Sequence, residues 1–302
     1  MSRYKLDPSQ ILLRRIIALA ILSIARPAIG WEPSNADVKS GAAPLQLNST
    51  ELNESSGIAF SNVSPNCIWS HNDSGDTPRL IAFNEEGQLT GWLHLNDVKA
   101  VDWEDMDSYD DGGARILVAD VGDNIAARQS VKIYLFNEPE PEKGTGVASF
   151  QTLTVRYEGG PRNCEAVTVD ISNRRILLLS KSPLTATLHS VPLPPREDTP
   201  EGELQYEYTA KLLAKALPIP MATGMDLCPK TGDIWISSYL HALRFSLPED
   251  GEIEAAVKQM GQLLELPKLR QVEAIAVTDQ GRVWVSTEGL PAKVQRIRHS
   301  RK

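Results

Sequence analysis

Short apolar runs, rich in β-branched residues, alternate with Gly, Pro, Asn and Asp along most of the chain. The apolar positions rarely recur at the three- and four-residue spacing of an amphipathic helix. Apolar runs of this length, bounded by turn-forming residues, are typical of β-strands. The pattern therefore predicts an all-β protein.

One strand–turn–strand unit recurs five times. Each copy begins with a small or acidic residue, passes through a turn, and continues as a strongly apolar strand that ends in polar residues. The copies start at intervals of 48, 61, 59 and 49 residues, at Ser56, Glu104, Glu165, Gly224 and Glu273. Repeated units of this kind bury their apolar faces against their neighbours.

A third strand follows each pair, and a fourth follows in the first four copies. In the fourth copy the last strand is ambiguous, because residues 251–266 could instead form a short helix. The fifth copy ends after three strands, whereas residues 44–52, near the N-terminus, have no partner. We therefore predict a β-propeller whose ring is closed by this N-terminal strand. Five copies favour five blades, although the two long intervals leave room for a sixth. A two-sheet sandwich is the rival fold, but it gives no reason for the repetition.

The first thirty residues have a different pattern. Arg14 and Arg15 precede an apolar run over residues 16–25, and the small residues Ala28 and Gly30 follow it. This order is typical of a secretory signal peptide, and the run is about half the ~20 residues that a spanning helix needs. We predict a signal peptide over residues 1–30, a linker over 31–43, a single propeller domain over 44–302, and an extracytoplasmic location, secreted or periplasmic. An uncleaved anchor is the alternative.

The chain is acidic, with 31 Lys and Arg against 39 Asp and Glu and a net charge of −8. Five basic residues and one acidic residue lie within the first thirty, so the remainder has 26 basic and 38 acidic residues, a net charge of −12. An acidic chain matches a phosphate backbone poorly, so we expect no nucleic-acid partner. We also expect a monomer without a membrane span. Three cysteines, Cys67, Cys164 and Cys228, form no disulfide framework, and whether two of them pair stays open.

The repeats place acidic residues at one end of the propeller. In a blade the first strand lines the channel and the second returns antiparallel, so the start of one and the end of the other share a face. Carboxylates that converge there repel one another unless a cation joins them. Oxygen ligands suit Ca²⁺, whereas none of the five His residues has a zinc-like spacing to another His or to Cys. We predict a calcium site formed by Ser56, Glu104, Glu165, Asp226 and Glu273, with Gly224 at the fourth first-strand position. Alternatively, the glutamates accept hydrogen bonds from backbone amides between blades or line a hydrated channel.

The ends of the second strands supply further candidates. Asp73 and Asp120 could activate a water molecule, and Lys181 or Arg162 could offset anionic charge. The candidate substrate-binding residues are His71, Asn72, Asp76, Trp103, Asp123 and Asn124. The loops that hold these residues lack the full spacing of a calcium-binding loop, and their Asp and Gly also favour tight turns. Trp103 could stack on a ligand or pack between blades. No nucleophile elbow, Walker loop or dinucleotide fingerprint is present in the sequence.

Several stretches resemble bacterial exported β-propeller proteins of largely unassigned function. These stretches are WSHNDSGDTPRLIAFNEEGQL (69–89), VDWEDM (101–106), ADVGDN (119–124) and NCEAVTVD (163–170), and the resemblance covers roughly residues 50–290. It extends to phytase-like and lactonase-like propellers that hold calcium in the channel. The placement of Ser56, Glu104, Glu165 and Glu273 is similar to that in calcium-activated nucleotidase propellers, which implies calcium ligation by these residues. The sequence departs from that pattern in two ways: Gly224 stands at the fourth position, and no basic residues that would clearly bind a phosphate chain are present.

Two functions from different classes follow. The first is a calcium-dependent hydrolase that acts on a small ester, lactone or phosphoester. The second is a non-catalytic propeller whose channel mouth binds a glycan, a peptide or a cell-envelope partner. Both types of protein occur on this fold, so the fold alone does not separate them.

Overall fold

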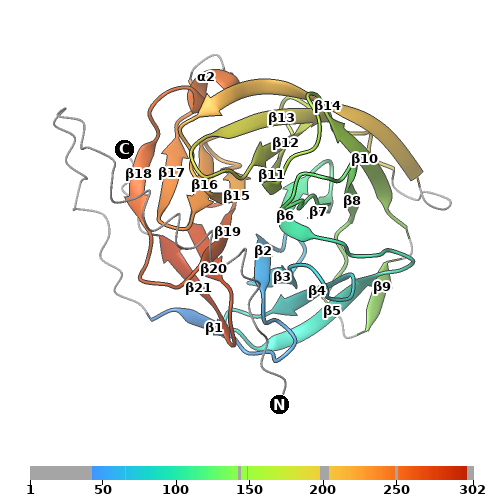
Figure 1. Cartoon of the computed structure of the whole chain (residues 1–302). Coiled ribbons are helices and arrows are strands. Elements are labelled where there is room, and N and C mark those ends of the chain that lie inside the picture. The colour runs from blue at the N-terminus through green and yellow to red at the C-terminus, as the bar shows by residue number, and fades with distance from the viewer. Residues whose placement is uncertain are drawn as a thin grey trace. The chain divides into compact units, whose positions relative to one another are not determined.

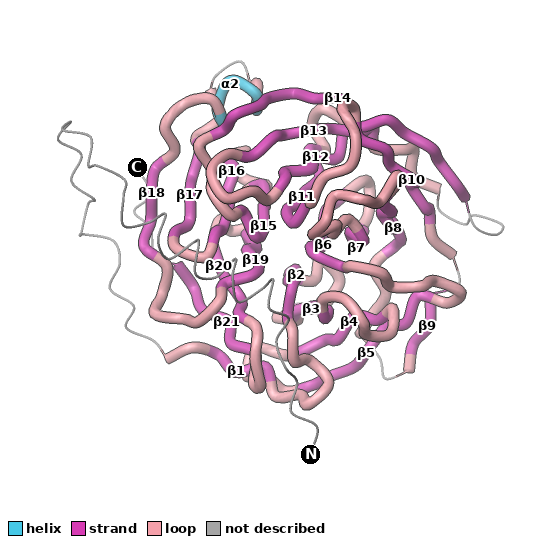
Figure 2. Tube along the Cα trace, viewed as in Figure 1, coloured by secondary structure: helices cyan, strands magenta, loops and turns pink. Residues whose placement is uncertain are grey.

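The computed structural model describes residues 43–64, 66–141, 144–147, 149–197, 204–248 and 251–297. The predicted signal peptide lies outside the described residues, and so does the predicted linker apart from Ala43. In the part of the chain that is described, strands dominate and one short helix is present, α2 (Ile253–Val257). Figure 2 shows this helix in cyan beside the strands. Within the same residues, no helix has the length and apolar character needed to cross a bilayer.

Five strands form the innermost layer, one from each repeat. They are β2 (Ser55–Phe60), β6 (Trp103–Asp110), β11 (Cys164–Asp170), β15 (Ala222–Leu227) and β19 (Val272–Val277). Each contacts the next in cyclic order, and β19 returns to β2. Figure 1 shows these strands around a common centre, with the other strands outside them. The architecture is that of an all-β propeller, as predicted.

Each inner strand begins a sheet that grows outward by antiparallel pairing. Outside β2 lie β3 (Ile68–Asn72), β4 (Arg79–Phe83) and β5 (Leu89–Leu95). Outside β6 lie β7 (Ala114–Asp120), β8 (Val131–Asn137) and β10 (Gln151–Tyr157). Outside β11 lie β12 (Arg175–Ser180), β13 (Ala186–Pro192) and β14 (Leu204–Leu217). Outside β15 lie β16 (Ile234–Ser238), β17 (His241–Phe245) and β18 (Gln262–Glu265), and outside β19 lie β20 (Val283–Thr287) and β21 (Ala292–Ile297).

The last sheet is completed from the other end of the chain. β1 (Leu45–Leu47) pairs antiparallel with β21, so the N-terminal strand fills the fourth place that the fifth repeat leaves vacant. The ambiguous segment of the fourth repeat contains both of the predicted alternatives, because α2 precedes β18 within it.

Two parallel pairings cross the limits of the repeats. β14 pairs with β10, which joins two four-stranded sets into one eight-stranded sheet, and β9 (Thr145–Val147) pairs with β5 as a fifth strand. The described strands therefore form four hydrogen-bonded sheets, and the count of five blades stays a prediction.

The hydrophobic core lies between the faces of neighbouring sheets. Large side chains such as Trp69, Trp103 and Trp235 are fully buried there, among Val, Ile and Leu from adjacent strands. Inner strands are covered on both faces, so almost all of their residues are buried, including the polar Asp105 and Asp107 of β6. All three cysteines are buried and free, so none of them pairs.

Every inner strand carries a β-bulge where it starts. The pairing of the first and second strands skips one residue in each repeat. The skipped residues are Ser56, Glu104, Glu165, Thr223 and Glu273. A bulge leaves its extra residue unpaired and redirects its side chain. In the fourth repeat the equivalent residue is therefore Thr223, which corrects the assignment of Gly224 to this position.

Candidate functional site

The five bulged residues define one end of the channel, which we call the mouth. Ser56, Glu104, Glu165 and Glu273 are buried there, and the Ser56 Oγ donates to the Glu104 carbonyl at 3.1 Å and to its Oε2 at 3.4 Å. The charge of Glu165 raises the pKa values of both Glu104 and Glu273, so these three carboxylates lie near one another. The structure thus brings four of the five predicted metal ligands together.

A tighter group of carboxylates lies within the mouth. Asp73 follows β3, Asp102 immediately precedes β6, and Glu104 occupies the bulge of β6. One carboxylate oxygen from each of these residues lies within 4.8 Å of the other two. Three oxygens at this separation form a group that could hold a metal ion. We call Asp73, Asp102 and Glu104 the carboxylate trio.

Gly122 allows the trio to form. A Cβ atom at Gly122 would stand 2.3 Å from the Glu104 Oε1 and 2.4 Å from the Asp102 Oδ2, well inside van der Waals contact. The Gly122 amide also donates to the Asp102 carbonyl at 3.1 Å, which fixes the backbone beside the trio. Only glycine lets the backbone approach these carboxylates so closely.

Burial and like charge disfavour the ionised forms of the trio. Burial, with the charge of Asp73 next in size, raises the pKa of Asp102 to about 7. Burial also raises the pKa of Glu104 well above its usual value, and the charges of Glu165, Asp73 and Asp102 add to the effect. A bound cation would reverse this balance, since it favours the deprotonated carboxylates.

Lys181 holds the other side of the mouth. Its ammonium forms an ion pair with Glu165 and donates to the Tyr239 hydroxyl at 2.8 Å, and it lies 4.8 Å from the centre of the Tyr239 ring. Burial lowers the pKa of Lys181, but the charges of Glu165, Tyr239 and Glu273 together hold it above its ordinary value. Lys181 is therefore a fixed cation bonded to Glu165.

The pKa of Glu273 is also shifted upward. Burial raises it to about 8, against the charge of Lys181, while Glu288 and Glu165 add to the rise. At neutral pH, Glu273 is therefore mostly protonated. Tyr239, which faces both Lys181 and Glu273, was not among the predicted site residues.

Asn163 links the mouth to the loop after β7. Its Nδ2 donates to the Glu165 Oε1 at 2.8 Å and to the Asn124 Oδ1 at 3.2 Å, while its Oδ1 accepts from the Asp123 amide at 2.8 Å. This residue was also missed, although it stands two positions before Glu165 in a quoted motif. It fixes the orientation of the Glu165 carboxylate.

Asp226 does not join the mouth, which corrects its predicted place among the ligands. Its carboxylate lies further along the channel and accepts the amides of Leu227 at 2.6 Å and Val277 at 2.6 Å. By strand register Asp226 matches Asp107, whose carboxylate accepts the Val169 amide at 2.7 Å. The reason is that the bulged residue of the fourth repeat is Thr223, and Asp226 stands three residues after it, as Asp107 stands three residues after Glu104.

Asp105 is the deep carboxylate that accepts amides from three inner strands. It is fully buried, and it accepts the amides of Met106 at 2.9 Å, Val167 at 2.8 Å and Met225 at 3.3 Å. These three amides belong to β6, β11 and β15. Hydrogen bonds from amides of other blades were the alternative role that the sequence allowed for the glutamates. In the structure, Asp105, Asp107 and Asp226 accept such bonds.

Asp120 is buried below the mouth. Its oxygens accept the amides of Val101 at 3.1 Å and Asp102 at 3.2 Å, and they pair with Arg128 at 2.8 Å. All of these contacts position the segment that carries Asp102. Asp120 thus faces protein groups on each side, whereas Asp73 is partly exposed at the mouth.

The predicted substrate-binding residues divide by exposure. His71 and Trp103 are buried, and their rings meet edge to face with centres 5.5 Å apart. Of the two roles that the sequence left open for Trp103, the structure shows packing between strands of the core. Asn72 and Asp123 are buried and accept loop amides, those of Asn53 and Glu54 and those of Ala127 and Arg128 respectively. Asp76 is half-buried beside Arg79, and Asn124 is exposed beside the mouth.

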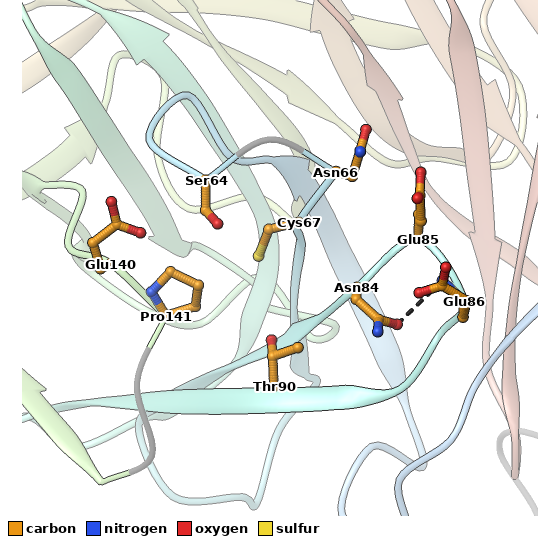
Figure 3. Close-up of a pocket in the computed structure, with 9 residues that line it drawn as sticks. All are labelled: Ser64, Asn66, Cys67, Asn84, Glu85, Glu86, Thr90, Glu140 and Pro141. Carbon is orange, nitrogen blue, oxygen red and sulfur yellow. Dashed lines mark hydrogen bonds between the residues drawn. The ribbon is translucent and has the colours of Figure 1, made fainter.

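A separate cavity of about 640 Å³ lies at the turns between β2 and β3 and between β4 and β5. Figure 3 shows the Cys67 sulfur and the Thr90 side chain among its lining residues, with Glu85, Glu86 and Glu140 around them. These turns are at the channel end opposite the mouth. Burial, with the charge of Glu138, raises the pKa of the Cys67 thiol to about 12, so the thiol stays protonated and unreactive at neutral pH.

Comparisons with known proteins show similarity at the level of shape. The chain matches no family model and no curated protein sequence. Among solved structures it is similar to a glucose dehydrogenase, with a TM-score of 0.49 and 13% identity over 86% of this chain and 100% of that one. It is also similar to the PQQ-bound aldose sugar dehydrogenase of Streptomyces coelicolor (TM-score 0.44, 10% identity, 83% and 95% coverage) and to a gluconolactonase of Xanthomonas campestris (0.42, 11%, 89% and 99%). With TM-scores below 0.5, these likenesses carry no argument about activity, and the resemblance to exported propellers of unassigned function stays a prediction.

Proposed function

We propose that the mouth binds Ca²⁺ and that the loaded protein hydrolyses a small ester, lactone or phosphoester. The observation that carries this proposal is the carboxylate trio, two members of which lie against Gly122. The nearby cation, Lys181, forms its ion pair with Glu165. Ca²⁺ accepts six to eight oxygen ligands in irregular geometry, so three carboxylates and the Ser56 hydroxyl leave positions for water and substrate. A bound cation supplies Lewis-acid polarisation of a substrate oxygen.

The remaining chemistry comes from side chains at the mouth. Asp73 and Asp102 are the half-buried members of the trio, and the Asp73 carboxylate can accept a proton from an attacking water. Glu273 has a pKa of about 8 and can donate a proton to the leaving oxygen at neutral pH. Lys181 and Asn163 hold Glu165 in place and keep one side of the mouth rigid.

The direct test combines calcium binding with a substrate panel. The wild-type protein is expected to show a calcium-dependent rise in Tm and calcium-dependent turnover of at least one ester, lactone or phosphoester. Glu104→Gln removes a trio charge and is expected to weaken calcium binding at least tenfold, to lose the Tm rise and to reduce turnover about a hundredfold. Glu86→Gln, at the opposite end of the channel, is the matched control and should behave as wild type. An unchanged calcium response in Glu104→Gln contradicts the site.

A second prediction concerns the glycine. Gly122→Ala places a methyl group where the Asp102 and Glu104 oxygens now lie. We expect calcium affinity to fall at least tenfold in titration calorimetry, because the trio must spread to admit the methyl group. Gly75→Ala is the control, since a Cβ there meets no atom within 4 Å, although its positive φ costs some stability. Equal affinities in the two variants would argue against the trio as the ligand set.

Non-catalytic binding of a glycan, peptide or cell-envelope partner is the second candidate. Lys181 favours this candidate, because its ammonium is bonded to both Glu165 and Tyr239, as expected of a structural residue. A calcium-dependent Tm rise without turnover across the whole panel would support this candidate over the hydrolase.

We also propose five blades, cleavage of residues 1–30, export, and a monomeric state. Five inner strands in cyclic contact and five equivalent bulges support the count. The mass of the protein recovered from outside the cytoplasm tests the cleavage, and sedimentation tests the monomer.

A further inference from the structure

Exposed apolar side chains gather at one end of the propeller. Among the described residues the exposed large hydrophobic side chains are Val101, Ile125, Leu184, Leu212, Leu240, Met260 and Leu290. Leu212 lies on the outer strand β14, and Met260 lies between α2 and β18, at the end away from the mouth. The other five lie in loops that also carry residues of the mouth.

The correspondence is close along the sequence. Four loops join a second strand to a third strand beside the mouth, and each presents one exposed aliphatic residue. Ile125 follows Gly122, Leu184 follows Lys181, Leu240 follows Tyr239, and Leu290 follows Glu288. Val101 stands next to Asp102 in the same way. The corresponding loop of the first repeat, residues 73–78, is polar and leaves a gap. We call Val101, Ile125, Leu184, Leu240 and Leu290 the apolar rim.

The rim contributes little to the fold. Ile125 is 85% exposed, Leu184 68% and Leu290 61%, so most of each side chain meets solvent. A single exposed aliphatic residue needs no explanation, but four equivalent loops with the same feature at one end of the molecule do. Covering these side chains would remove apolar surface from water and would be favourable.

The arrangement also indicates what covers the rim. Protein–protein interfaces usually have an apolar centre and a polar edge, and their strongest contacts are Trp, Tyr and Arg. Here the order is reversed, since aliphatic tips surround a recessed polar centre. A lipid surface can accept separated aliphatic tips individually and still leave the centre facing water and headgroups.

We propose that the mouth face docks onto a lipid–water interface through the apolar rim. Loops at the same end that join successive sheets expose charges of both signs, Lys99 and Arg270 as well as Glu54 and Glu158. Docking therefore depends mainly on apolar contact, and neutral phosphatidylcholine vesicles bind about as well as vesicles containing anionic lipid. The proposal does not depend on calcium or on hydrolysis at the mouth.

The test is co-sedimentation of the full chain with phosphatidylcholine vesicles in the presence of a chelator. Each aliphatic side chain that loses about half of its exposed surface contributes roughly fivefold to tenfold to partitioning. Ile125→Ser with Leu184→Ser is therefore expected to bind about 25- to 100-fold more weakly. Met260→Ser is the matched control, because Met260 is 89% exposed at the other end, and it should bind as wild type. Equal Tm values show that all three proteins are folded.

A site-specific measurement gives an independent readout. The natural cysteines are buried, so a thiol-reactive, polarity-sensitive dye labels Ile125→Cys or Met260→Cys selectively. Vesicles should shift the emission to the blue for Ile125→Cys and leave it unchanged for Met260→Cys. No vesicle binding, equal shifts at both positions, or binding that needs anionic lipid overturns the proposal. Self-association of the wild type that the double variant abolishes also overturns it, in favour of a second copy of this chain on the rim.

Discussion

An Asp105→Ala variant is expected to lose about 3–5 kcal/mol of unfolding free energy, because the substitution leaves buried backbone amides without an acceptor. Asp105 is fully buried and accepts the amides of Met106, Val167 and Met225. These donors come from three inner strands, so the carboxylate connects three repeats at the channel. The alanine variant also creates a small cavity where the carboxylate lay, which adds to the loss.

Urea unfolding followed by circular dichroism measures this effect. Asp110→Ala is the matched control, since Asp110 is an exposed aspartate on the same strand, where it caps a turn through the Gly113 amide. We expect the control to lose no more than about 1 kcal/mol. Asp105→Asn keeps an oxygen acceptor but turns an NH₂ group toward one of the amides, so its stability should lie between the two. Similar losses for Asp105→Ala and Asp110→Ala would show that the three amides find other partners.

Much of the fold could be predicted from the repeats alone. The second strand of each repeat is strongly apolar and ends in polar residues, so its ends are easy to locate. The unpartnered N-terminal segment predicted the pairing of β1 with β21. The parallel pairs β10–β14 and β5–β9 could not be predicted in this way, because they join outer strands of different length through contacts that no repeat encodes.

The site was predictable at the level of its acidic positions but not of its layers. The sequence aligned the fourth repeat on Gly224, one residue too late, because no acidic residue marks its bulged position. Thr223 therefore occupies the mouth, and Asp226 lies deeper with Asp107. Gly122 matters because it lets the trio oxygens approach the backbone, and Asn163 matters because it orients the Glu165 carboxylate. Both effects depend on distances in the folded chain, so no sequence pattern predicts them.

Raising the pH from 6.5 to 8.5 in the presence of a chelator is expected to lower the stability of the protein. Glu273 has a pKa of about 8 and Asp102 of about 7 in the folded state, and both values lie far above those of the unfolded chain. The folded state therefore binds more protons than the unfolded state. Stability is fully present below the unfolded pKa, near 4, and it is lost as the pH rises through the folded pKa. The buried His71 and His189 oppose this change only at the lower end of the window, because folding lowers their pKa values and the unfolded imidazoles lose their protons near pH 6.5.

The size of the effect follows from the pH window. Glu273 contributes most of it, because Asp102 is more exposed and better screened, and together they give a loss on the order of 2 kcal/mol, or about 5 °C in Tm. Glu273→Gln should flatten the slope, whereas Glu265→Gln, an exposed residue on β18, should not. Calcium should remove the pH dependence that comes from Asp102, since the ion favours the carboxylate at every pH in the window. A Tm that rises between pH 6.5 and 8.5 in chelator would mean that the mouth carboxylates are already ionised in the folded protein, and that their mutual repulsion is relieved by some means other than protonation.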